Sequence, residues 1–211
     1  MKFDLMKHEL KKNLILDATF KCIYEQGING ISMRSIAQEA KVNQALIHYY
    51  FVNKDDLLLE LLQALLKRFV YDLKRSYRPS DPPEKKIENI MQVSEDYAAE
   101  QREMFTVFMD LWSLALRNPP MQKAFSDLFT EVSAAVESVL KEGIEKGVFN
   151  DVKVDILSFQ VSAINQGLSL IGLMVGKSFD AHEHFKAYRE TFLNQVIRDR
   201  SGQAVKAFGS R

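Results

Sequence analysis

Hydrophobic residues along the chain recur at intervals of three or four positions, which is the spacing of one face of a helix. The sequence contains neither sustained alternation at every second position nor the turn signals of a β-hairpin. The pattern therefore predicts an all-α fold of about nine helices. The expected helices cover residues 8–26, 33–40, 44–51, 54–77, 84–101, 104–117, 119–146, 152–175 and 181–199.

Proline and glycine mark three breaks between the longer helices, because proline cannot continue a helix and glycine favours its C-terminal end. The breaks are RPSDPP at 78–83, RNPP at 117–120 and EKGVFND at 145–151. We expect a three-helix domain over residues 1–53 and a larger helical domain over 54–211. The chain after residue 200 has no periodicity and is expected to be frayed.

Residues 32–51 read as two short helices joined by a tight turn, with Ser32 and Asn43 as N-caps. The predicted inward positions are Met33, Ile36, Ala37, Ala40, Val42, Ile47 and Phe51. The second helix then turns a polar and aromatic set outward, made of Gln44, Ala45, His48 and Tyr49. A helix of this length, with a polar outer face, suits the major groove of DNA, so the segment predicts a helix-turn-helix motif.

The charge of the chain adds little to this interpretation, since 28 basic residues balance 28 acidic ones. Residues 1–75 carry a small basic excess, which has the right sign for a part that meets phosphate. The single cysteine, Cys22, excludes an internal disulfide and fits a reducing compartment. No apolar run that would predict a signal peptide opens the chain, so a cytoplasmic protein is expected.

The stretch GINGISMRSIAQEAKVNQALIHYYFVNKDDLL resembles the DNA-binding signature of the TetR family of one-component repressors. The preceding ILDATFKCIYEQG looks like the first helix of that family, so the resemblance covers residues 10–60. The matching positions are Gly27, Ser32, Ile36, Ala37, Ala40, Val42, Ile47, Tyr50, Phe51, Lys54 and Leu57.

The resemblance implies a set of DNA contacts, made by Ser32, Arg34, Gln44, Ala45, Leu46, His48, Tyr49 and Lys54. Ser32 and Arg34 open the helix that crosses the phosphate backbone. Gln44 fits a bidentate contact to adenine, and Ala45 can touch a thymine methyl group. Tyr50 is ambiguous between the core and the DNA face.

Three positions depart from the family pattern. Lys41 stands where a glycine is common, so it either adopts a left-handed conformation at a cost of about 1 kcal/mol or adds a phosphate contact. Leu46 stands where threonine is frequent. His48 replaces the usual tyrosine and introduces a group that can titrate near neutral pH.

The C-terminal part is dense in methionine and aromatic residues, which favour either an apolar effector cavity or a solid core. The candidate effector residues are Phe105, Phe108, Met109, Trp112, Met121, Phe125, Phe159, Asn165 and Gln166. Asp110 could be a counter-ion for a cationic effector. However, it shares a helical stripe with Thr106, Ser113 and Arg117, which favours a solvent-facing position.

Residues 156–176 contain no charge and are long enough to span a bilayer. Six polar residues inside this stretch disfavour insertion, so burial by protein is expected instead. The resemblance implies that the last two helices pair with their copies in a homodimer. A twofold dimer would read a pseudo-palindromic operator.

An enzyme is not expected, because no nucleophile, acid–base pair, phosphate-binding loop or metal motif stands out, and no cofactor is predicted. The HEH sequence at 182–184 has the wrong spacing for a zinc-binding helix. We predict a DNA-binding repressor released by a small lipophilic or aromatic effector. The alternative is an all-α dimeric interaction module without sequence-specific DNA readout.

Overall fold

The computed structural model describes residues 2–99 and 102–198, and within these ranges the chain is helical apart from turns and one isolated β-bridge. The helices are α1 (Lys2–Gln26), α2 (Met33–Glu39), α3 (Gln44–Tyr50), α4 (Lys54–Arg75), α5 (Pro83–Ala99), α6 (Arg102–Ala115), α7 (Pro119–Glu145), α8 (Val154–Val175), the short 3-10 helix η1 (Gly176–Ser178) and α9 (Ala181–Val196). The predicted all-α class is therefore confirmed. The tail predicted to fray after residue 200 lies outside the described residues.

The helices begin where side chains can accept from free backbone N–H groups. Ser32 and Asn43 cap α2 and α3 as predicted, accepting from the N–H groups of Ser35 and Leu46. Asn53, Asn118 and Asp180 do the same for α4, α7 and α9. The first residues of these helices are therefore determined by the capping side chains that precede them.

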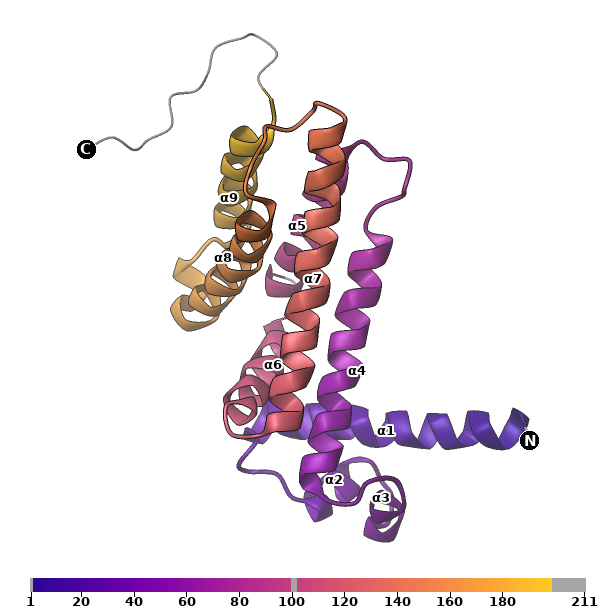
Figure 1. Ribbon diagram of the computed structural model, residues 1–211. Coiled ribbons are helices and arrows are strands. Elements are labelled where there is room, and N and C mark those ends of the chain that lie inside the picture. Colours follow the sequence, from indigo (N-terminus) through magenta and orange to yellow (C-terminus); the bar gives the residue numbers. More distant parts are fainter. Residues whose placement is uncertain (1, 100–101, 199–211) are drawn as a thin grey trace.

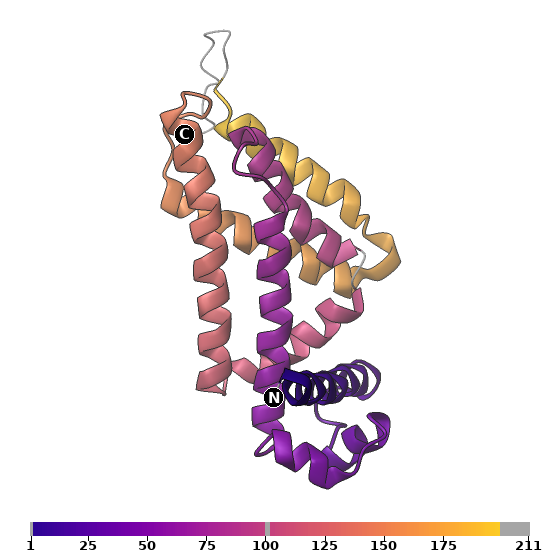
Figure 2. The ribbon, with the colours of Figure 1, turned by 90° about the vertical axis from the view of Figure 1, so that its right-hand side faces the viewer.

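The helices form an elongated molecule with two distinct ends. Figure 1 shows α4 and α7 running side by side along its length, with α1–α3 at one end and α8 and α9 toward the other. The view turned by 90° in Figure 2 shows α5 and α6 between α4 and the α8–α9 pair. Helix α3 therefore lies far from α8 and α9.

The first hydrophobic core crosses the domain boundary predicted at residue 53. Ile15, Ile36 and Ile47 of α1–α3 belong to the same buried cluster as Val107 and Leu111 of α6. The three N-terminal helices thus pack against α4 and α6 rather than standing on a linker. A displacement of α6 would therefore also move the side chains of α1–α3 that pack against it.

The second core joins the far end of α4 to α5, α7, α8 and α9. Phe149, in the turn after α7, is 2% exposed and packs against Gly143, whose position leaves room for the ring. The carbonyl of Gly143 accepts from the N–H groups of Val148 and Phe149 at 2.9 and 3.0 Å. Close helix–turn contact at Gly143 thus closes this end of the bundle.

Helix α8 leaves much of its apolar surface uncovered in the single chain. Phe159 and Met174 are 63% and 73% exposed, and Ile156, Ile164, Ile171 and Val175 are also exposed. Val154–Ser178 has the length and hydropathy of a membrane span, with 22% of its most apolar window buried. The predicted burial of this helix is thus incomplete within one chain.

Candidate DNA interface and ligand cavity

The α2–α3 pair is held by the residues that the sequence pattern assigned to its interior. Ile36 and Ile47 are fully buried, and Phe51 is 1% exposed. Val42 and Met33 pack against this core while remaining half-buried. The packing fixes α3 with one face inward and the other toward solvent.

The outward face of α3 carries the predicted contact residues together. Gln44, Ala45, His48 and Tyr49 are all exposed, and Tyr49 reaches 71% exposure. The Nε2 atoms of Gln44 and His48 lie 3.3 Å apart, one helical turn from each other. This geometry presents an amide, an imidazole and a phenol on one exposed surface.

The other predicted contact residues surround α3 in different ways. Ser32 and Arg34 are exposed at the start of α2, and the Ser32 hydroxyl accepts from the Ser35 N–H. Leu46 is half-buried beside the α3 N-cap. Tyr50 is also half-buried, with its ring 4.6 Å from that of His8 and 5.1 Å from that of Tyr49. Tyr50 therefore supports the ring of Tyr49 from the α1 side.

Lys41, in the turn between α2 and α3, adopts a φ of 54°. This is the left-handed conformation expected from its place in the motif, and it is unfavourable for a residue with a Cβ. Its side chain is exposed.

We expect Lys41→Gly to raise the free energy of unfolding by about 0.5–1 kcal/mol, because glycine adopts a positive φ without the steric penalty. Chemical denaturation of the two proteins measures the difference. Lys41→Ala, which keeps the penalty, is the matched control and should leave stability nearly unchanged. Equal stability of the glycine and alanine variants would contradict the strain.

Lys54 does not project freely from the start of α4. Its ammonium donates to the carbonyl oxygens of Ile28 and Ile31, both at 2.8 Å, and so ties α4 to the turn before α2. Burial lowers the pKa of this half-buried lysine. Two of its three N–H donors are engaged by the turn, which leaves one for the predicted phosphate contact.

Asp110 reaches the same turn from the other side. Its Oδ2 accepts from the backbone N–H of Ile28 at 3.1 Å, and its side chain is half-buried. The solvent-facing position favoured by its helical stripe is therefore wrong, since α6 packs against α1 where Asp110 lies. The backbone of Ile28 is held at its N–H by Asp110 of α6 and at its carbonyl by Lys54 of α4, an arrangement we call the Ile28 clamp.

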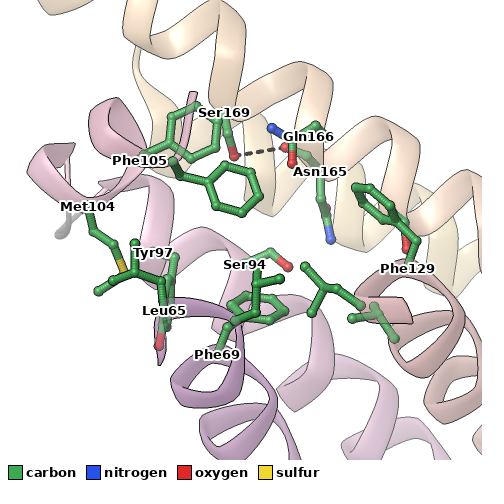
Figure 3. A pocket seen from close by; sticks show the side chains of 15 residues that line it. Leu65, Phe69, Ser94, Tyr97, Met104, Phe105, Phe129, Asn165, Gln166 and Ser169 are labelled. Atoms are coloured by element: carbon green, nitrogen blue, oxygen red, sulfur yellow. Dashed lines mark hydrogen bonds between the residues drawn. The ribbon is translucent and has the colours of Figure 1, made fainter. Parts of the chain in front are cut away.

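A cavity lies between α4, α5, α6, α7 and α8 (Figure 3), and part of its wall belongs to the first core. Its volume is about 100 Å³, and its walls are mainly apolar. The lining residues are Leu65, Leu66 and Phe69 of α4, Ser94 and Tyr97 of α5, Met104, Phe105 and Phe108 of α6, Leu128, Phe129 and Val132 of α7, and Ser162, Asn165, Gln166 and Ser169 of α8. Polar groups are concentrated on α8.

Tyr97 closes the cavity on the α5 side with its hydroxyl turned away to a carboxylate. The hydroxyl donates to Oδ2 of Asp72 at 2.6 Å, and the ring packs edge-on against Phe69 at 4.9 Å. Burial and the neighbouring Asp72 raise the pKa of Tyr97, so the phenol stays protonated. Asp72 lies behind the ring and is not part of the lining.

The nine candidate effector residues fall into three groups in the structure. Phe105, Phe108, Asn165 and Gln166 line the cavity. Trp112, Phe125 and Phe159 line a separate open groove between α6, α7 and α8. Met109 contacts Gln166 through its sulfur, and Met121 is fully buried in the first core.

Sequence reasoning did not select the cavity residues of α4 and α5. Leu65, Leu66 and Phe69 belong to the apolar stripe of α4, which resembles any core-facing stripe. Ser94 and Tyr97 lie in a helix of mixed composition. Only the packing of five helices shows which of these side chains share one space.

Both parts of the chain match models of known families. Residues 15–61 match the model of bacterial regulatory proteins of the TetR family, and residues 83–197 match the C-terminal model of BetI-type transcriptional repressors. An HTH-type transcriptional regulator BetI from Burkholderia thailandensis is 22% identical over 191 residues, covering 84% of this chain and 89% of the relative.

Solved structures share the fold over most of the chain. A TetR transcription regulator from Haloarcula marismortui has a TM-score of 0.83 at 22% identity, covering 90% of this chain and 100% of its own. A transcriptional regulator from Saccharomonospora viridis, in complex with choline, has a TM-score of 0.80 at 22% identity, covering 89% and 98%. With the helix-turn-helix and the helical C-terminal part both matched, the chain belongs to the TetR family of DNA-binding transcriptional regulators.

Proposed function

We propose that this regulator is a homodimeric, cytoplasmic repressor that leaves a pseudo-palindromic operator when a small molecule enters the α4–α8 cavity. The observation that carries the proposal is the Ile28 clamp, which connects the helix that lines the cavity to the turn that precedes α2. The matched models support the regulatory role.

The DNA-facing part of the proposal rests on the exposed surface of α3. Gln44 and Tyr49 project from a helix whose other side is fixed by Ile47 and Phe51. A rigid helix with exposed polar groups can place them in the major groove without ordering the chain on binding. Ser32, Arg34, Ala45, Leu46, His48 and Lys54 remain the other proposed contacts.

The coupling would run through α6. Phe105 and Phe108 line the cavity, and Asp110 lies half a turn further along the same helix, bonded to Ile28. A ligand that favours a different position of α6 would also change the position of the turn before α2. Coupling of this kind is typically 1–3 kcal/mol, which lowers DNA affinity about 5-fold to 150-fold.

The exposed apolar face of α8 supports the proposed dimer. Phe159, Ile171 and Met174 would be covered by a second copy, and Gly167 leaves space for a close approach. Such a contact would account for the hydropathy of α8 without a membrane. The exposed positions of α9 are mostly polar, so α8 would provide most of the apolar contact.

The effector is proposed to be small, because the cavity is small. The regulator from Saccharomonospora viridis binds choline, and the present cavity contains aromatic rings from Phe69, Tyr97 and Phe105 that suit apolar ligands or a quaternary ammonium. Choline is therefore one ligand to test.

We expect Tyr49→Ala to weaken operator binding at least about fivefold at fixed salt, since one direct DNA contact is worth about 1–3 kcal/mol. The operator is first selected from a random duplex pool with the wild-type protein, and affinity is then measured by fluorescence anisotropy. Circular dichroism checks that the fold is intact.

The matched control is Tyr71→Ala, which removes another exposed tyrosine, 57% exposed on α4. It should leave operator affinity unchanged. A wild-type protein that selects no sequence from the pool would support the alternative of an interaction module, and so would an unchanged affinity of Tyr49→Ala.

A further inference from the structure

The α8 wall of the cavity contains polar atoms that have no partner within the described residues. These are the amide oxygen of Asn165 and the hydroxyl of Ser162, both buried at the atomic level. Asn165 as a whole is 7% exposed. A buried polar group without a hydrogen bond costs about 1–3 kcal/mol, so a site that keeps two of them is suited to a polar ligand atom.

The donors of two other polar side chains of this wall, Ser169 and Gln166, are already engaged. The Ser169 hydroxyl donates to the backbone carbonyl of Asn165 at 2.9 Å, and the side-chain amide of Gln166 donates to the sulfur of Met109 at 3.8 Å. Figure 3 shows Asn165, Gln166 and Ser169 along one side of the cavity, with Phe129 beside Asn165 and the ring of Phe69 on the opposite side. Ser162 and Asn165 therefore provide the two buried polar atoms of the α8 wall that have no partner among the described residues.

Their spacing allows one ligand atom to satisfy both. Ser162 and Asn165 are three residues apart on α8, so their side chains lie on the same face of the helix. A hydroxyl group both donates and accepts. It can donate to the Asn165 amide oxygen while it accepts from the Ser162 hydroxyl. A ketone or ether oxygen can only accept and leaves the Asn165 oxygen unpaired.

The rest of the cavity defines the body of the ligand. The described lining residues carry no charged side chain, and the Asp72 carboxylate outside the lining accepts from the Tyr97 hydroxyl. A volume of about 100 Å³ is of the order of a single ring, since a cavity of about 150 Å³ in another protein holds benzene. An uncharged ring of five or six carbons fits both constraints.

We propose that the cavity binds a small uncharged alcohol or phenol of about one ring, with its hydroxyl between Asn165 and Ser162 and its carbon skeleton among the aromatic side chains. This inference deepens the proposed function and rests on the cavity being the effector site. It makes Asn165 the residue that determines specificity for a hydroxyl group.

The test compares cyclohexanol with cyclohexanone, which has the same heavy-atom skeleton but cannot donate a hydrogen bond. Binding to the purified full-length protein, without DNA, is measured by titration calorimetry, and choline is the cationic comparison. We expect cyclohexanol to bind about tenfold more tightly than cyclohexanone, since loss of the donor leaves the Asn165 oxygen unpaired. Choline should bind more weakly than cyclohexanol.

Asn165→Leu keeps the shape of the side chain and should reduce the preference for cyclohexanol over cyclohexanone to about twofold or less. Ser162→Ala is the second variant and should reduce the preference in part. The matched control is Ser158→Ala on the same helix, whose hydroxyl donates to the Asp155 carbonyl and does not line the cavity. Circular dichroism checks each variant for folding.

Equal binding of the alcohol and the ketone, tighter binding of choline, absence of any binding, or an unchanged preference in a folded Asn165→Leu protein would overturn the inference. Operator release is measured separately with the selected duplex. If cyclohexanol binds with the expected selectivity but does not release the operator, the ligand class stands and the proposed effector function fails.

Discussion

Replacing Gly143 with alanine should lower the free energy of unfolding by about 2–3 kcal/mol. A Cβ at this position of α7 would overlap the ring of Phe149, which is buried in the second core. Overpacking of a rigid core costs about 1–3 kcal/mol and sometimes more, while the better helix propensity of alanine returns less than 1 kcal/mol. Because the Phe149 ring cannot retreat to solvent, the turn after α7 must shift.

Chemical denaturation of the wild type and Gly143→Ala measures this effect. The double variant Gly143→Ala/Phe149→Leu is the rescue control, since the smaller side chain makes room for the methyl group and should recover part of the loss. Gly143→Ala should still bind the operator well below its melting temperature, because α3 packs in the first core and the substitution affects the second. A Gly143→Ala protein as stable as the wild type would show that Phe149 does not require a glycine.

The helix-turn-helix could be predicted from the sequence in considerable detail because its determinants are local. The caps Ser32 and Asn43 bond to N–H groups three residues away, and Ile47 and Phe51 are buried as their i, i+4 spacing indicates. The left-handed Lys41 was also foreseeable, because it occupies a turn position where the family often has glycine. These features depend on residues only a few positions apart, so the sequence pattern alone is enough to predict them.

The Ile28 clamp could not be predicted, because its members are far apart in the chain and bond to backbone atoms. Asp110 is 82 residues from its partner Ile28, and Lys54 is 26 residues away. Carbonyl and N–H groups are the same at every position, so no residue type marks them as partners. The helical stripe of Asp110 indicated solvent only because the contact between α6 and the α1–α2 turn is absent from a helix considered alone.

The cavity shows the same limit in another form. Met and Phe residues on α6 were candidate wall residues, yet Met121 and Phe125 of the next helix lie in or beside the first core. A cavity differs from a solid core in the unfilled volume between its side chains, not in their hydrophobicity. That volume depends on the angles and distances at which the helices pack. By contrast, Asn165 was a candidate because it is polar in an uncharged helix, and its amide oxygen is one of the two polar atoms of the α8 cavity wall without a partner among the described residues.

Replacing Lys54 with methionine should destabilise the N-terminal part and weaken operator binding together. The substitution removes two hydrogen bonds from a charged donor and leaves the Ile28 and Ile31 carbonyls without their partner. Hydrogen bonds to charged groups contribute about 1.5–3 kcal/mol each, and removing the half-buried charge returns some of this, so we expect a net loss of about 2–3 kcal/mol. Denaturation of the full chain measures the change.

The operator measurement for Lys54→Met separates its structural role from its proposed phosphate contact. Lys67→Met, which removes an exposed lysine from the same helix, is the matched control and should change neither property. If Lys54 has a structural role, the variant should bind the operator more weakly than the wild type by a similar factor at low and at high salt. If only a phosphate contact is lost, the slope of log affinity against log salt concentration should decrease by about one unit. Full stability of Lys54→Met would contradict the clamp. In that case, a reduced salt slope would assign Lys54 to DNA, and Asp110 would remain as the side chain that links α6 to the turn before α2.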